Sequence, residues 1–407
     1  MGLAERDPDL ATAAILARRA TFRADADVVA NLAGRTRADA VNQVLNAPIN
    51  TDQAPITEES EEVVVWWMQR IAAAGSGLHE RMTFFWHDLL PTHRNAIGWR
   101  ELIPIQLNMI RSNALGNFRD LLQAMVVDGG MIRYLDADSS TKNRTNENLA
   151  RELMELFSTG TGHYSEDDVR QAALAMTGWR VDRDSNAVYF DPGRAYEDPV
   201  TFLGETRKWD VASITDRLCD HPATAARIAS LLWYYFVGTE LTGDAKTELG
   251  LWWQGQDLEI KPLLERILND DAFWEYHYAR PRTGFEFYAA AQNILQFDLT
   301  ELWRPRNLGQ ALYEPPNVSG WPKGERWLNP DSLLRRSEML FSVDFRDIPN
   351  GRTATVDEIL TQSGLYSVSD ETLAAINGAN NPDGIGEEGV VELQWRIALS
   401  SPEFQLQ

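Results

Sequence analysis

The sequence contains few of the residues on which covalent or metal-based sites are commonly built. It has a single cysteine, Cys219, and six histidines among 407 residues. One cysteine excludes an intrachain disulfide and a cysteine-based zinc site. No stretch approaches the roughly 18 consecutive apolar residues of a membrane-spanning helix, so no membrane span is predicted. The first thirty residues lack the apolar segment of a signal peptide, and the localisation is left unknown.

Basic residues are also in the minority. Sixty acidic residues stand against thirty-eight basic ones, which gives a net charge of −22. Because this charge repels the phosphates of DNA and RNA, we expect no nucleic-acid partner. An apolar fraction of 44% over 407 residues is enough for one large core or two packed domains. None of these features indicates the oligomeric state.

Apolar residues recur at helical spacing along most of the chain. Helices bounded by turn residues are predicted at 36–45, 58–75, 77–90, 103–130 (two helices meeting near Gly116), 221–238 and 390–401. The spacing changes near 181–205, where short β-type runs alternate with turn residues. The patterns predict an all-α fold: a single large multi-helix domain with a small β-hairpin-like insert. Its expected parts are N-terminal helices and a linker (1–55), the helical core with the insert (56–345), and a C-terminal connector and helix packed on the same core (346–407).

The stretch NENLARELMELF, which begins at residue 146, has one apolar and one polar helical face. The polar face holds Glu147, Asn148, Arg151, Glu152 and Glu155. One interpretation is a structural or solvent-facing surface, in which charges four positions apart form ion pairs. The other is the wall of a site, in which Arg151 orients a carboxylate and Glu147 or Glu152 acts as a general acid or base. Asn148 would then contact the substrate.

A second candidate group lies in the stretch FFWHDLL, where Asp88 follows His87. With Glu147 or Glu152 it offers the mixed nitrogen and oxygen ligands that several divalent metals accept. The alternative is a hydrogen-bonded core histidine inside an aromatic helix. The cofactor is therefore unknown, with a divalent metal as the candidate, and His87 is also a candidate for substrate binding.

The stretch PPNVSGWPKGERW, which begins at residue 315, is rich in proline and glycine and predicts a rigid, irregular loop. In one interpretation it is a packed loop whose Trp321 and Trp327 fill the core. In the other it forms the rim of a site and presents Asn317 and Trp321 to a ligand. Trp179 and Trp321 are then candidates for stacking on a sugar ring.

Three segments have a distinctive amino-acid sequence: RMTFFWHDLL (81–90), NENLARELMELFSTGTGHYSEDDVRQAALAMTGWRV (146–181) and LGQALYEPPNVSGWPKGERWLNPDSLLRR (308–336). With shorter matches, they resemble a bacterial family known only as domain of unknown function 1800. The resemblance implies a mostly helical fold, relatives that are often exported, and a sulfatase-like family as partner. It implies no activity, because none is established for the family.

The chain departs from the family pattern within the predicted insert. Relatives usually have a His-Asp pair followed by a lysine before the TFLG sequence. Here Glu197 takes the place of the histidine, Asp198 is retained, and the lysine is missing. If that histidine carries chemistry in relatives, this chain has lost or altered it.

Two functions are compatible with these patterns. The first is a hydrolase, acting on carbohydrate or a related substrate, with a cleft lined by the 146–155 face, His87, Trp179 and the 315–327 loop. The second is a non-enzymatic interaction or assembly protein in which the same residues form a structural polar network. An enzyme requires an open pocket with carboxylates of altered pKa, whereas a scaffold requires paired or exposed side chains.

Overall fold

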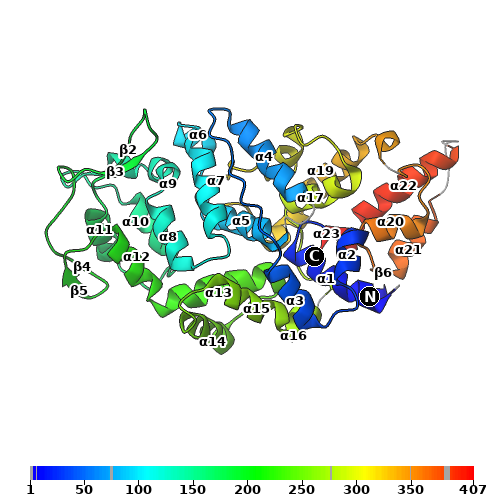
Figure 1. The fold of residues 1–407 in the computed structure, drawn as a ribbon, viewed down its shortest axis with the longest axis horizontal. Coiled ribbons are helices and arrows are strands. Elements are labelled where there is room, and N and C mark those ends of the chain that lie inside the picture. The colour runs from blue at the N-terminus through cyan, green and yellow to red at the C-terminus, as the bar shows by residue number, and fades with distance from the viewer. Residues whose placement is uncertain (1–2, 6, 74–76, 276, 349, 380–385) are drawn as a thin grey trace.

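Helices account for most of the chain, as the apolar spacing predicts (Figure 1). The computed structural model describes residues 3–5, 7–73, 77–275, 277–348, 350–379 and 386–407. The first eleven helices are α1 (Pro8–Ala20), α2 (Ala26–Leu32), α3 (Arg37–Leu45), α4 (Ser60–Ala72), α5 (Gly77–Leu89), α6 (Arg94–Ile97), α7 (Leu102–Asn113), α8 (Phe118–Val126), α9 (Gly129–Tyr134), α10 (Asn148–Glu155) and α11 (Glu166–Ala175).

The second half of the described chain continues in the same way. Its helices are α12 (Val211–Cys219), α13 (Pro222–Val237), α14 (Gly243–Gln254), α15 (Ile260–Asn269), α16 (Asp271–Glu275), α17 (Gly284–Leu295), α18 (Trp303–Asn307), α19 (Pro330–Phe341), α20 (Val356–Gln362), α21 (Asp370–Asn377), α22 (Gly386–Ser400) and α23 (Pro402–Gln405). Short 3-10 helices are η1 (Ala137–Ser139), η2 (Gly324–Leu328) and η3 (Phe345–Asp347). Part of the connector expected before α22 lies outside the described residues.

Local capping explains where several helices begin and end. The Ser165 side chain accepts a hydrogen bond from the main chain of Asp168, whose carboxylate accepts one from the Ser165 main chain, so α11 begins with a capping box. Pro222 occupies the first position of α13, which suits a residue without an N–H. Gly238 ends that helix at φ 91°, where a Cβ would come within 2.6 Å of the Ala279 Cβ.

Strands are confined to three two-stranded antiparallel sheets in the described chain. Strands β2 (Trp179–Val181) and β3 (Val188–Phe190) form one hairpin, and β4 (Val200–Phe202) and β5 (Glu205–Arg207) form another. These two hairpins confirm the predicted β insert. The third sheet pairs β1 (Leu3–Glu5) with β6 (Ser367–Ser369), which joins distant parts of the chain and was not predicted.

One continuous cluster of buried apolar side chains runs from Ala11 to Phe404. Its largest members include Trp67, Trp86 and Trp253, each with an exposed fraction near zero. Together with the helices, this core confirms the predicted all-α, single large domain. Many of the tryptophan side chains are buried in it. In the described ranges, none of the helices combines the length and apolarity that a bilayer span requires.

The fold separates the predicted site residues. Figure 1 shows α10 and α11 toward the end of the molecule that carries the two hairpins. Helix α5, which carries His87, lies nearer the middle, and α19, which follows the 315–327 loop, lies beyond it.

Candidate functional site

Hydrogen bonds between side chains and main chain fix the polar segment that leads into α10. The Ser140 hydroxyl accepts from the Asn146 main chain at 3.0 Å, and the Asn146 side-chain oxygen accepts from the Asn148 main chain at 2.9 Å. An open hollow of about 380 Å³ lies beside this segment, lined by Ser139, Arg144, Thr145, Asn146, Glu147 and Asn148. Two of the predicted site residues, Glu147 and Asn148, therefore line an accessible surface.

Helix α10 has the two faces that its sequence predicts. Leu149, Ala150, Leu153 and Met154 are buried against the core. The polar positions between them are exposed or half-buried, which leaves one charged face on the outside of the helix.

Arg151 ties α10 to α11. Its guanidinium donates to both carboxylate oxygens of Glu166, at 2.9 and 2.8 Å, and to Glu147 at 3.1 Å. The predicted pair with Glu147 is confirmed. The contact with Glu166 could not be predicted from helical spacing, because Glu166 lies on another helix. This bidentate ion pair occupies the Arg151 guanidinium and holds the pKa of Glu166 below its usual range.

The carboxylates of Glu152 and Glu155 have no hydrogen bond or ion pair with any residue that the structure describes. Both side chains are half-buried. Burial raises the pKa of Glu152, the negative charge of Glu155 raises it further, and Arg151 opposes the shift. Glu152 is therefore a carboxyl that binds a proton more readily than an ordinary glutamate.

Two tyrosines lie near this pair of acids. Burial raises the pKa of Tyr134, and the charge of Glu152 adds to the shift. Burial likewise raises the pKa of Tyr164, and Glu155 is the largest of the neighbouring charges that act on it. Both hydroxyls therefore keep their protons at neutral pH and can donate hydrogen bonds. Sequence reasoning missed Tyr134, because η1 and the segment after it separate it from α10 along the chain.

His87 lies in the core instead of on a surface. Its side chain has an exposed fraction of zero, and its Nε2 accepts a hydrogen bond from the Tyr313 main chain at 3.1 Å. Burial lowers its pKa to about 3, so the ring is neutral. The Trp67, Tyr313 and Trp321 rings surround it, with centroids 4.4 to 5.4 Å away. This placement corresponds to the core histidine that the sequence left as an alternative.

The 315–327 loop is anchored on α5. The Trp321 main chain donates to Asp88 at 3.3 Å, and Lys323 forms an ion pair with the same carboxylate. Trp321 and Trp327 are 3% and 4% exposed. The two indoles fill the core, as the packed-loop alternative expects, and this structure does not present Trp321 for stacking on a sugar.

The remaining two predicted residues, Asn317 and Trp179, make their contacts with residues outside α10. Asn317 is exposed, and its side-chain oxygen accepts from the Ser319 main chain at 2.8 Å, so it stabilises a turn. Trp179 is half-buried in β2, and its ring centroid lies 5.6 Å from that of Phe190 across the hairpin.

The structure does not assemble the predicted metal ligands. Within the described residues, no three or more histidine, cysteine, aspartate or glutamate side chains are grouped so that they could hold a metal ion. The site suggested for His87, Asp88 and Glu147 or Glu152 is therefore not formed. The reason is that His87 faces the core, while the two glutamates lie on the exposed side of α10.

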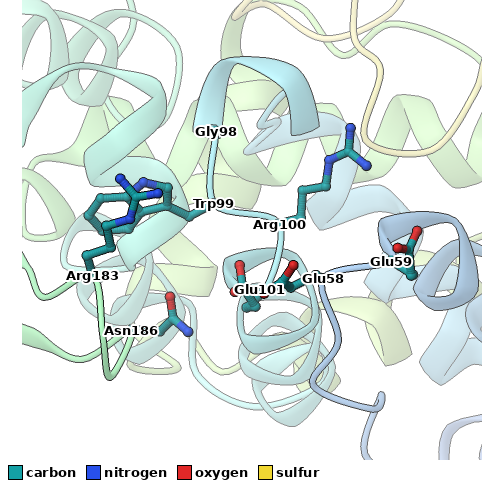
Figure 2. Close-up of a pocket in the computed structure, with 8 residues that line it drawn as sticks. All are labelled: Glu58, Glu59, Gly98, Trp99, Arg100, Glu101, Arg183 and Asn186. Atoms are coloured by element: carbon teal, nitrogen blue, oxygen red, sulfur yellow. The ribbon is translucent and has the colours of Figure 1, made fainter.

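A second polar hollow, of about 330 Å³, lies between the segments around Glu58, Trp99 and Arg183 (Figure 2). Figure 2 shows Trp99 and Arg183 side by side, and the Arg183 guanidinium carbon lies 6.0 Å from the ring centre. Arg133 lies 4.4 Å from the same ring. The Trp99 ring is therefore in contact with two arginine side chains of the same chain. None of the site residues predicted from the sequence lines this hollow.

Comparison with known proteins reaches almost the whole chain. The profile of the family described as "Protein of unknown function (DUF1800)" matches residues 15–406. Neither the curated proteins nor the solved structures provide a match. Because the matched range includes the core, the α10 motif and the 315–327 loop, the chain belongs to the domain of unknown function 1800 family.

Proposed function

We propose that the protein is a hydrolase that uses the polar face of α10 for acid–base catalysis on a neutral, hydroxyl-rich substrate such as a carbohydrate. The observation that carries the proposal is the Glu152 carboxyl, which is half-buried, has a raised pKa and lacks a partner among the described residues. General acids and bases work best when their pKa lies near the operating pH, and the raised pKa moves the Glu152 carboxyl toward that condition.

Glu152 and Glu155 have different roles in the proposed reaction. Hydrolysis of an acetal requires one carboxyl to protonate the leaving oxygen and a second, ionised carboxylate to act on the water or the sugar carbon. Glu152, with the raised pKa, is the proton donor, and Glu155 is the ionised partner. Side chains three positions apart on a helix have Cβ atoms about 5–6 Å apart, so both carboxyls can reach one bound substrate.

The charge of the face sets the class of substrate. Arg151 is occupied by Glu147 and Glu166, so it positions α10 against α11. The groups left free are carboxylates and the neutral Tyr134 and Tyr164 hydroxyls, which suit the hydroxyls of a sugar and disfavour an anionic substrate. Asn148, at the rim of the adjoining hollow, is placed to contact the same substrate.

The test is hydrolysis of a panel of 4-nitrophenyl glycosides by the purified chain, its Glu152→Gln variant and a Glu248→Gln control. Glu248 is an exposed helical glutamate, so the control makes the same charge change away from α10. We expect nitrophenolate release by the wild-type chain and the control, and a loss of about 100-fold or more in Glu152→Gln without a fall in Tm. Absence of turnover by the wild-type chain, or equal turnover by Glu152→Gln, would overturn the proposal.

The second candidate function is a non-enzymatic interaction protein, and the Arg151 bridge between α10 and α11 is the observation that favours it. The face would then dock a partner, for which the family resemblance suggests a sulfatase-like protein. Size-exclusion chromatography of the chain with such a protein distinguishes the candidates. A complex that Arg151→Met abolishes supports docking, and separate elution of the two proteins contradicts it.

A further inference from the structure

Five arginines from four separate segments meet in the interior. They are Arg18 on α1, Arg81 on α5, Arg280 and Arg282 before α17, and Arg336 on α19. Each has an exposed fraction of 5% or less. We call these five residues the arginine cluster. Contacts and charges connect them: the Arg336 guanidinium donates to the Arg282 carbonyl at 2.7 Å, and the charges of Arg18 and Arg81 act on Arg282.

Negative charge is scarce around the arginine cluster. Glu286 pairs with Arg81 at 2.8 Å and with Arg280 at 2.6 Å. Among the described residues, it is the only carboxylate in an ion pair with any member. The Nη atoms of Arg18 and Arg336 donate to neutral oxygens, including Gly364 O at 2.9 Å and Gln405 Oε1 at 2.6 Å. Among the described side chains, these five guanidinium groups therefore share one ion-paired carboxylate.

Arg282 is the least satisfied member. Its guanidinium makes no hydrogen bond to any described residue, although only 4% of the residue is exposed. Its Nη1 atom is fully buried without a partner, and the Nε atoms of Arg18, Arg81 and Arg336 are in the same condition. The Phe404 ring, 4.5 Å from the guanidinium carbon, covers one side of the group. Burial, followed by the charge of Arg18, lowers the pKa of Arg282 to about 9.

A buried charge is stable only when it is paired and hydrogen-bonded. A guanidinium remains charged at neutral pH, so this group cannot escape the cost by losing its proton. The described side chains do not provide the missing negative charge. We propose that the arginine cluster encloses a binding site for one small inorganic anion, which accepts hydrogen bonds from Arg282 and the neighbouring N–H groups. A tetrahedral oxyanion such as phosphate or sulfate suits the forked donors of arginine best, and chloride is the smaller alternative.

This inference is independent of the proposed activity of α10, because none of the residues involved lies on that helix. It also separates two kinds of anion effect. A specific site saturates and depends on Arg282, whereas a general salt effect on a protein of net charge −22 does not.

The experiment measures Tm for the full chain while sodium gluconate, whose anion is bulky, is replaced by sodium phosphate at constant ionic strength. We expect a saturable rise in the wild-type chain, by about 3 °C once phosphate exceeds its Kd about 100-fold. The Arg282→Met variant should lose this rise. Arg170→Met, which removes an exposed guanidinium, should keep it. Sulfate and chloride series then identify the preferred anion.

Two results would overturn the proposal. One is an equal rise in the wild-type chain and Arg282→Met, and the other is no rise with phosphate, sulfate or chloride. Arg282→Met should fold, because replacing an unpaired buried charge by an apolar side chain of similar size is often stabilising. Should it not fold, calorimetric titration of the wild-type chain with phosphate decides: saturable binding near one ion per chain supports the site, and its absence overturns it.

Discussion

The polar face of α10 and the interior around Glu286 carry opposite imbalances of charge. On α10 the only arginine is occupied by Glu147 and Glu166, and the carboxylates of Glu152 and Glu155 have no partner among the residues that the structure describes. Around Glu286, the one described carboxylate that pairs with the arginine cluster is occupied, and buried guanidinium nitrogens are left without partners among the described residues. A chain with a net charge of −22 thus holds locally positive groups where the dielectric is lowest.

The comparison teaches that the unpaired carboxylates of α10 and the unpaired guanidinium groups around Glu286 require different binding partners. A half-buried, accessible carboxyl can exchange a proton with solvent and substrate. A buried guanidinium stays charged at neutral pH and requires a counter-ion. Four substitutions sharpen this contrast, from the largest expected effect to the smallest.

Glu286→Gln should have the largest effect, because it removes the one carboxylate that forms ion pairs with the arginine cluster among the described residues. We expect a loss of about 3–5 kcal/mol in the free energy of unfolding at pH 7, measured by urea denaturation. Burial opposes ionisation of Glu286, but Arg280 and Arg81 outweigh it and lower its pKa to about 2. The stabilisation is therefore complete above the unfolded value near ~4.3 and is lost as pH falls toward 2. An unchanged difference between the two proteins at pH 2–3 would contradict this assignment.

Trp321→Ala should have the next largest effect on the free energy of unfolding, toward the lower end of about 3–5 kcal/mol, because it opens a cavity beside His87. The matched control is Trp303→Ala, since Trp303 is 42% exposed and should cost much less. Both are measured by urea denaturation. Equal costs would show that the loop does not fill the core and would return Trp321 to the surface candidates.

Arg151→Met should cost no more than about 1 kcal/mol, because its ion pairs are partly exposed and screened by water. The loss should shrink in 1 M sodium chloride, where the Debye length is about 3 Å. Thermal unfolding at low and high salt measures it. A loss that does not change with salt would show that Arg151 acts through packing of its aliphatic stem instead.

Glu152→Gln should have the smallest effect on the free energy of unfolding, and it should stabilise the protein where the other three substitutions destabilise it. The folded pKa of Glu152 is raised, so the native state binds its proton more tightly than the unfolded chain does. The wild-type chain therefore loses stability as pH rises through the folded pKa, and the variant does not. At pH 7 we expect the variant to be more stable by less than about 1 kcal/mol, with no difference below pH ~4. A destabilised variant at pH 7 would mean that the ionised carboxylate has a stabilising partner.

Much of the fold could be predicted from local pattern. Apolar spacing located α3, α5 and α13, because this pattern depends on residues a few positions apart. Pairing of β1 with β6 could not be predicted, since neither three-residue strand has a distinctive pattern and the two lie at opposite ends of the chain.

The candidate site was only partly predictable for the same reason. The split of α10 into two faces and the Glu147–Arg151 pair follow from helical spacing. Burial of Trp321 depends on Asp88, which lies 233 positions away, and the second partner of Arg151 comes from α11. The arginine cluster draws on four segments, so no window of sequence reveals that its charges meet.

The most direct test of the α10 assignment is a carbon NMR titration of Glu152 in chain labelled at its glutamate carboxyls, assigned with the Glu152→Gln variant. We predict that the Glu152 carboxyl titrates above the usual glutamate range and that Glu155→Gln moves its pKa back toward that range. A Glu152 pKa at or below the ordinary value, unaffected by Glu155→Gln, would contradict the claim that α10 holds a carboxyl suited to acid–base catalysis.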